Sequence, residues 1–356
     1  MRTTTRTAAR RTAAAITAVM VGLLAAGCAS PPHRHPVSAT AADLTGSGGA
    51  IQNIRAGQIL RLGLPADLSP APALAGTELG LYRRHLRNVA LQPLSYLSDL
   101  QEIGALEHGQ LDAAYLDPVA ALAAWQASTP GSLRLIAGVS TGTSQLIARP
   151  GITSPAQLRG TRVEAPADSS QAAYLADWLT RNHLAGRVTL DGSAITTIGI
   201  LRQFTTGTVT AAWEPAPLDQ ELIAAGGHVL ATQPAATTTV LVVTQRFLTA
   251  NPTAVRNLLT AQIQSCTQDR AHPAATITAA ARMLQTLTGS RLTPAVLTAS
   301  ATQVTCTADP GAASLQAQAR LAASAAMIRP ANLGSLYDLT ILNSLLRSQG
   351  KQTVKS

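Results

Sequence analysis

Hydrophobic and polar positions follow two different periods between about residue 59 and residue 250. Short apolar runs, bounded by Gly, Pro, Asn or Asp, predict β-strands. Between them, apolar residues three or four positions apart predict amphipathic helices. The runs that predict strands are 59–64, 89–94, 111–116, 133–139, 145–148, 161–165, 209–213 and 237–243. This alternation of strand and helix predicts a parallel α/β construction.

Several of the predicted helices have clear start and stop signals. Ser98 is placed to cap a helix that ends at His108-Gly109, and Ser169 or Ser170 to cap a helix with Trp178 on its apolar face. Further helices are predicted over 73–86, from Ser154-Pro155 onward, over 196–204, and from Asn251 to the C-terminus. The helical signals after residue 251 follow the last predicted strand without interruption.

The order of these elements divides the 356 residues into five parts. A chain of this length is large enough to build two units, each with its own core. We expect the chain to start one lobe, build a second and then return to the first. The expected parts are a signal peptide over 1–27, a tether over 28–57, lobe I over 58–144, lobe II over 145–236, and a return strand with C-terminal helices over 237–356.

The N-terminus carries the pattern of an exported protein. Four arginines precede the apolar stretch 13–26, which is too short to span a bilayer but suits a signal peptide. The stretch ends in Ala25-Ala26-Gly27-Cys28, which resembles the lipobox of bacterial lipoproteins, although Leu is usual at the position of Ala25. We therefore expect Cys28 to carry a lipid and anchor the protein to the extracytoplasmic face of the cell membrane. The alternative is an ordinary secretory signal with an incidental cysteine.

Charge and composition narrow the classes of partner. The net charge of +9 falls to +5 once the four arginines of the signal peptide, which contains no acid, are removed. The remaining basic residues are scattered, so we expect no nucleic-acid partner. The tether is rich in Ser, Pro and Gly, and we interpret its His33 and His35 as solvated linker residues. We expect neither a metal nor a cofactor.

The two cysteines beyond Cys28 are Cys266 and Cys306. An even pair in an exported protein predicts a disulfide, which here would close a loop of about 40 residues. The alternative is two buried thiols.

A series of short stretches in one order resembles a known family. Examples are Gly80-Leu81-Tyr82 and Gln157-Leu158-Arg159-Gly160. Further stretches in the same order are 60–63, 71–76, 105–115, 137–142, 150–152 and 334–340. Together they resemble the nitrate/aliphatic sulfonate/taurine-type solute-binding lipoproteins of ABC transporters, in their actinobacterial branch. The resemblance covers about residues 58–350.

This resemblance implies a fold and a function. The implied fold is an α/β type II periplasmic binding protein with two lobes, a two-strand hinge and C-terminal helices. The implied function is that of a monomeric solute-binding component of an ABC importer. It would hold a small polar ligand, for example a sulfonate or nitrate, between its lobes and deliver it to the permease, which works with an ATPase. The alternative is a lipoprotein of the same fold that acts as a sensory or partner-binding module.

The resemblance also implies ligand-binding positions. In lobe I they are Asp67, Ser69, Ser98, Asp99, Asp117, Ser140, Thr141 and Thr143, and in lobe II Ser169, Ser170, Gln171, Trp213 and Glu214. Helix N-termini aimed into the cleft would favour an anion. Ser98 and Ser169 are equally explained as helix caps, and Trp213 as a core residue.

The chain departs from the family pattern at two of these places. Its residues 168–172 replace a Gly-Asn-Thr-Gln-Asp-like run, and 215–218 replace Pro-Glu-Pro-Trp. The carboxylates of Asp67, Asp99 and Asp117 would repel an anion. A neutral or cationic ligand therefore stays open.

Two enzyme classes are alternatives to this function. Gly138-Val139-Ser140-Thr141-Gly142 matches the nucleophile elbow of hydrolases, but that motif needs a helix after it, and here another strand is predicted. Pyrimidine-precursor synthases share the fold, but their histidine-rich signature is missing. We therefore expect a protein that is not an enzyme.

Overall fold

The structure is a computed structural model, and it describes residues 58–87, 89–192 and 196–356. These residues all belong to one compact unit. The predicted signal peptide, the tether and Cys28 lie outside the described residues. Of the helices that are described, none is both long and apolar enough to cross a bilayer.

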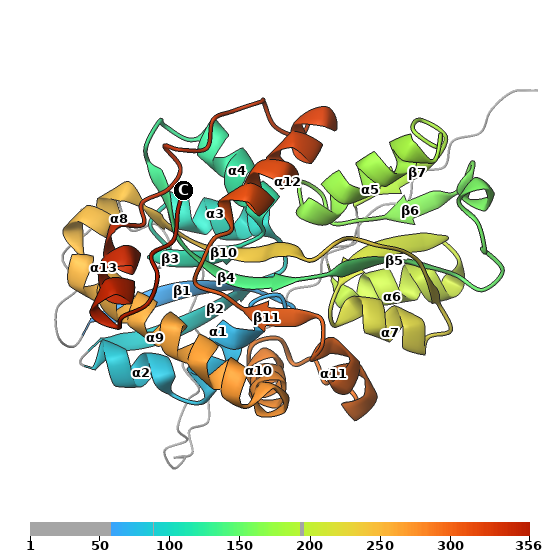
Figure 1. Cartoon of the computed structure of the whole chain (residues 1–356). Coiled ribbons are helices and arrows are strands. Elements are labelled where there is room, and N and C mark those ends of the chain that lie inside the picture. The colour runs from blue at the N-terminus through green and yellow to red at the C-terminus, as the bar shows by residue number, and fades with distance from the viewer. Residues whose placement is uncertain (1–57, 88, 193–195) are drawn as a thin grey trace, which may run out of the picture. The chain divides into compact units, whose positions relative to one another are not determined.

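The first sheet has six strands in the order β11-β4-β10-β3-β1-β2 (Figure 1). Its strands are β1 (Ile59–Pro65), β2 (Ala90–Tyr96), β3 (Ala113–Leu116), β4 (Leu133–Gly142), β10 (Ala236–Thr244) and β11 (Val304–Cys306). β1 is parallel to β2 and β3, whereas β10 is antiparallel to β3 and β4. We call this sheet and the helices packed on it lobe I.

The second sheet has five strands in the order β7-β6-β8-β5-β9. Its strands are β5 (Ser144–Ala148), β6 (Arg162–Glu164), β7 (Thr189–Asp191), β8 (Ala211–Pro215) and β9 (His228–Thr232). β6 is parallel to β7 and β8, whereas β5 is antiparallel to β8 and β9. We call this sheet and its helices lobe II.

The chain crosses between the two sheets twice, as Figure 1 shows. β4 leads through Thr143 into β5, and β9 leads through residues 233–235 into β10. The two crossings are bonded to each other, because the amide of Gln233 donates to the carbonyl of Ser144 at 3.0 Å. The α/β fold with a two-strand connection is therefore present, as the sequence predicted.

Helices cover both faces of the first sheet. Alternate residues of β10 point to opposite faces, with Leu241 and Val243 in one core and Val240 and Val242 in the other. The first core includes α1 (Ala71–Glu78), α2 (Leu81–Leu86), α8 (Gln245–Ala250), α9 (Pro252–Ala271), α10 (Pro273–Thr288) and α13 (Thr340–Ser348). The second includes α3 (Asp99–Glu107), α4 (Pro118–Ala127) and α12 (Ala312–Ser324). The first sheet is thus buried on both sides.

The second sheet is covered in the same way. On one face Trp213 and Leu146 pack with α5 (Ser170–Arg181). On the other, Ile147 and Ala212 pack with α6 (Thr197–Thr206) and α7 (Leu218–Ala224). A short 3-10 helix, η2 (Pro155–Leu158), precedes β6. A further helix, α11 (Pro294–Ser300), packs against α7.

Two sequence expectations about these elements were wrong. The helix expected over 73–86 is interrupted at Gly80, whose φ of +70° lies in the left-handed region, so α1 and α2 are separate. The stretch after residue 251 is not wholly helical, because β11 pairs antiparallel with the end of β4. A strand of three residues is too short to show a period of two.

The predicted disulfide is present. It joins Cys266 of α9 to Cys306 of β11. Both cysteines are buried. The bridge therefore ties the edge strand of the first sheet to the helix that covers it.

Candidate ligand-binding site

Acidic side chains follow the parallel strands of the first sheet at the point where each strand ends. Asp67 comes after β1, Asp99 after β2 and Asp117 after β3. In lobe II, Glu164 is the last residue of β6, and Glu214 lies near the end of the parallel strand β8. Open α/β sheets bind ligands beyond the carboxyl ends of their strands. The topology therefore places these carboxyl groups where a ligand would bind.

The lobe I residues are bonded to one another. The amide of Asp117 donates to Oδ1 of Asp99 at 2.9 Å, and the amide of Ser69 donates to Oδ1 of Asp67 at 2.6 Å. The hydroxyl of Ser140 donates to the carbonyl of Ser69 at 2.6 Å. The loops after β1, β2 and β3 are thus fixed by side chains that the sequence had nominated.

One carboxylate oxygen joins the two lobes. Oδ1 of Asp117 accepts the amides of Val119 at 2.7 Å and Ala120 at 3.3 Å, which caps α4 in lobe I. The same oxygen accepts the amide and the hydroxyl of Ser170, both at 3.0 Å, at the start of α5 in lobe II. Asp117 therefore places its own negative charge at the N-terminal ends of two helices, where their dipoles favour an anion.

A glutamine from the C-terminal part of the chain completes this contact. Gln318 of α12, a helix that packs against both α4 and α5, is fully buried. Its Oε1 lies 2.6 Å from the hydroxyl of Ser170, whose single proton is shared with Asp117, and its Nε2 donates to the carbonyl of Thr237 in β10 at 2.9 Å. Gln318 therefore connects the start of α5 to one of the strands that cross between the sheets.

Burial raises the pKa of every carboxyl group in the lobe I cluster. It raises the pKa of Asp67 to about 6 and that of Asp117 to about 7, and the nearby Asp99 adds to both. Burial also raises the pKa of Asp99, and it raises the pKa of Glu102, one turn further along α3, well above the usual range. The charges of Asp99 and Asp67 add to the effect on Glu102. These groups hold protons more tightly than exposed carboxyls do.

In lobe II, Glu164 and Glu214 form a carboxyl pair. Both are buried, and their places on the neighbouring strands β6 and β8 put them on one face of the sheet. Burial raises the pKa of Glu164 to about 7. Burial is also the main cause that raises the pKa of Glu214 well above its usual range, and the charge of Glu164 is the second. The charge of Asp67, from lobe I, also raises the pKa of Glu214. Glu214 thus lies within electrostatic reach of the opposite lobe.

The ion pairs of the described residues lie outside this cluster. They join Arg61 to Asp112, Arg162 to Asp191 and Arg181 to Asp177. The charged groups that act on Asp67, Glu102, Asp117 and Glu214 are other carboxyl groups. The candidate site is therefore rich in carboxyl groups.

The other nominated residues have structural partners. Ser98 caps α3 and Ser169 caps α5. Trp213 is buried in strand β8 and donates its indole N–H to the hydroxyl of Ser144 at 2.7 Å. The remaining three are Thr141 and Thr143, which contact the segment 303–305, and Gln171, which is buried in the first turn of α5.

Sequence reasoning missed Glu102, Glu164 and Gln318. Glu102 lies three residues after Asp99, a spacing that places both on one side of α3. Glu164 ends a predicted strand, which is a usable signal. Nothing in the local sequence marks Gln318, because its role depends on a helix that packs from far along the chain.

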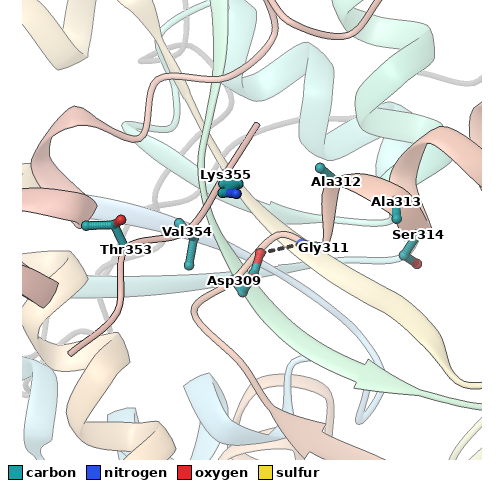
Figure 2. Close-up of a pocket in the computed structure, with 8 residues that line it drawn as sticks. All are labelled: Asp309, Gly311, Ala312, Ala313, Ser314, Thr353, Val354 and Lys355. Carbon is teal, nitrogen blue, oxygen red and sulfur yellow. Dashed lines mark hydrogen bonds between the residues drawn. The ribbon is translucent and has the colours of Figure 1, made fainter.

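A surface hollow lies apart from these residues. Its volume is about 380 Å³, and it lies between the start of α12 and the C-terminal tail (Figure 2). It is lined by Asp309, Gly311, Ala312, Ala313, Ser314, Thr353, Val354 and Lys355, none of which was nominated for ligand binding. This hollow is not the predicted site.

The nucleophile-elbow motif does not have the geometry of an elbow. Ser140 lies inside β4, and the chain continues into β5 rather than into a helix. Its hydroxyl is bonded to the carbonyl of Ser69 and lies 3.0 Å from the hydroxyl of Thr238. Ser140 therefore stabilises the crossing between the sheets.

Comparison with known proteins supports the class that the fold and the strand-end site define, which is that of the periplasmic binding proteins. No protein family model and no curated protein sequence matches the chain. Solved structures do match in fold. The alkanesulfonate-binding protein SsuA from Xanthomonas axonopodis pv. citri, bound to MOPS, has a TM-score of 0.63 at 17% identity, over 76% of this chain and 94% of its own.

Two further structures show the same fold. The periplasmic nitrate-binding protein NrtA from Synechocystis PCC 6803 has a TM-score of 0.68 at 10% identity, over 82% of this chain and 88% of its own. A zinc-bound ligand-binding component of an ABC-type import system from Staphylococcus aureus has a TM-score of 0.68 at 14% identity, over 80% of this chain and 97% of its own. The fold also occurs in an enzyme, DSZB, at 18% identity. At these identities the comparisons show the fold alone.

Proposed function

We propose that this protein is the extracytoplasmic solute-binding component of an ABC importer, anchored by lipid at Cys28. It holds a small polar ligand between lobes I and II and delivers it to a permease. The observation that carries the proposal is the hydrogen bonding across the lobes between Asp117, which follows β3 of lobe I, and Ser170 at the start of α5 in lobe II. Fold neighbours that bind alkanesulfonate or nitrate support it.

The mechanism follows from the two crossings between the sheets. Because few residues connect the lobes there, small backbone rotations at Thr143 and residues 233–235 would open or close the space between them. A ligand that touches both lobes favours the closed form, and the permease would recognise that form. Asp117, Ser170 and Gln318 are the residues whose bonds must break when the lobes separate.

A thermal unfolding screen tests the binding function. A ligand that binds only the folded protein raises its melting temperature, by an amount that grows with the logarithm of the ligand concentration relative to its Kd. Sulfonates, nitrate, amines and pyrimidines form the panel. A concentration-dependent rise with one class supports the proposal, and no rise with any class contradicts it.

Membrane fractionation tests the anchor. The wild-type protein should partition into the membrane fraction of its host, and the Cys28→Ala variant should appear in the soluble exported fraction, because the acyl chains supply the anchoring. Equal membrane retention of both would contradict lipid attachment at Cys28.

A sensory or partner-binding module is the second candidate. The observation that favours it is Asp117, whose carboxylate already uses helix N-terminal amides that could otherwise bind an anionic ligand. Such a protein would keep the fold without importing a solute. Normal growth of a deletion strain on every solute that the screen identifies would support this candidate over import.

A further inference from the structure

We infer that the exposed side of α2 is a membrane-contact surface, and that anionic phospholipid headgroups are what it contacts. Its residues are Arg83, Arg84 and Arg87, together with the hollow beside them, and we call this surface the α2 patch. The inference goes beyond the proposed solute-binding function. It takes from that proposal only the anchor at Cys28, which places the membrane near lobe I.

The first observation is a local excess of positive charge. Arg83, Arg84 and Arg87 are all exposed. Among the described residues, no carboxylate forms an ion pair with any of the three. The nearest acid before them is Glu78, and residues 79–98 contain none. Basic residues are scattered over most of the chain, but at α2 three of them share one exposed surface, where they would attract an anionic partner.

The second observation is a hollow that joins these charges to an apolar wall. Its volume is about 520 Å³. Arg83 and Arg87 line it from α2, and Val89, Leu91 and Pro93 line it from the start of β2. A phospholipid headgroup presents the same combination, because its anionic phosphate is attached to an apolar acyl region. The hollow therefore suits an amphipathic anion.

The third observation is that the chain from the anchor enters the body beside this patch. Gln58 is the first described residue, and its carbonyl accepts the amide of Ala90 at 2.9 Å. Ile59, which pairs with Ala90 in the register of β1 and β2, is 52% exposed. Arg87 lies only three residues before Ala90. A lipid on Cys28 would therefore hold lobe I by the corner that carries the α2 patch.

This orientation leaves the candidate ligand site uncovered. β1 and β2 start at the corner where the chain enters, whereas Asp67 and Asp99 come after their carboxyl ends. In Figure 1, α2 lies on the side of lobe I that is away from lobe II. Contact between the α2 patch and a membrane would therefore not block the space between the lobes.

The arrangement of the arginines favours a membrane over a soluble anion. Tight binding of one phosphate needs donors that converge on it. Here Arg84 does not line the hollow, and all three arginines come from one short helical segment. They thus form a spread charge, which matches a surface of many headgroups. The anchor also gives the membrane a high effective concentration at this corner, which no soluble partner shares.

Vesicle sedimentation of the chain that begins at Ala29 tests the inference. This chain carries no lipid, and it contains every described residue and so the whole compact unit that they form. It should bind vesicles of mixed phosphatidylglycerol and phosphatidylcholine but not vesicles of phosphatidylcholine alone. Binding should weaken as salt is raised from about 0.1 M to about 1 M, because the screening length falls from about 10 Å to about 3 Å.

The decisive variant carries Arg83→Gln, Arg84→Gln and Arg87→Gln together. An arginine near an anionic membrane surface strengthens binding about fivefold, so the triple variant should bind the mixed vesicles about a hundredfold more weakly. The three side chains are exposed, so the variant should fold, and its thermal unfolding midpoint checks this.

The matched control replaces Arg159, Arg187 and Arg202 by Gln. These are three exposed arginines of lobe II, so the net charge changes by the same amount. The control should bind the mixed vesicles more tightly than the α2 variant does, at nearly the wild-type affinity. Equal weakening by both triple variants would show that net charge alone drives binding, and it would overturn the assignment to the α2 patch.

Two further probes distinguish other occupants of the patch. Inorganic phosphate stands for a small anion, and polyglutamate stands for an acidic protein. If either of them binds in a way that the α2 variant abolishes, and the mixed vesicles are not bound, the membrane contact is overturned. Equal binding to both kinds of vesicle, or binding to neither, overturns it as well.

These outcomes are independent of the proposed function. The test chain has no acyl group, so a failure of lipid attachment at Cys28 would leave the vesicle result unchanged. The ligand screen addresses the space between the lobes, which the α2 substitutions do not touch. Loss of vesicle binding would therefore overturn this inference and leave solute binding standing.

Discussion

Oδ1 of Asp117 lies 3.0 Å from both the amide and the hydroxyl of Ser170, and this pair joins the N-terminal ends of α4 and α5 across the two lobes. In a periplasmic-binding-protein fold, a ligand can form such a bridge from outside the chain. Here part of the bridge is intramolecular, so the balance between open and closed forms depends on Asp117 before any ligand arrives.

Replacing Asp117 by Ala should therefore have two effects. Loss of the cap on α4 should lower the free energy of unfolding by about 1 to 2 kcal/mol. Loss of the bond to Ser170 should enlarge the radius of gyration in small-angle scattering. Thr196→Ala removes the cap of α6 without touching lobe I, so it should lose stability without expanding. Expansion of both variants, or of neither, would contradict the role of Asp117.

Stability should decrease as the pH rises. Folding raises the pKa of Asp67 to about 6 and the pKa of Asp117 and Glu164 to about 7, mainly through burial. The folded protein then binds more protons than the unfolded chain between about pH 4 and pH 7, so the free energy of unfolding falls as pH rises through this window.

Urea unfolding at several pH values measures this effect. The groups that face these carboxyls are Asp99, Glu102, Asp191, Glu214 and Ser170. The charge of Asp99 raises the pKa of Asp67 and Asp117 and that of Asp191 raises the pKa of Glu164, whereas the hydrogen bond with Glu214 lowers the pKa of Glu164. A midpoint that is higher at about pH 8 than at about pH 5 would contradict the acidic cluster.

Replacing one acid of the lobe II carboxyl pair should stabilise the protein, whereas most substitutions of buried residues destabilise it. Glu164→Gln removes one of two buried acids and supplies an N–H that can donate to Glu214. Near pH 8 the ligand-free variant should be more stable than the wild type, by about 1 kcal/mol. Glu221→Gln, a half-buried acid of α7, is the control and should change stability less. A destabilised Glu164→Gln variant would show that the pair is not repulsive.

The disulfide should contribute a large share of the stability. It closes a loop with a sequence separation of 40 residues. In the chain-entropy treatment such a bridge is worth about 4 kcal/mol. Cys266→Ala with Cys306→Ala should lower the free energy of unfolding by about that amount, measured by urea unfolding without reductant. If reduction of the wild type and the double substitution both left the midpoint unchanged, the bridge would be shown to be unimportant.

The sequence predicted most strands because their apolar runs are bounded by clear turn residues, and it predicted the caps Ser98 and Ser169 because capping is local. It missed β7, β9 and β11, which are edge strands of the two sheets. For the site, the family resemblance gave Asp67, Asp99, Asp117 and Glu214. Glu164, which strand register places beside Glu214, and Gln318 were missed because contacts across large sequence separations position them.

Native mass spectrometry of the protein isolated from its own host tests the central claim most directly. The account predicts a native mass that exceeds the denatured mass by one small polar molecule. Equal native and denatured masses, in a protein that no panel compound stabilises, would contradict a solute-binding function.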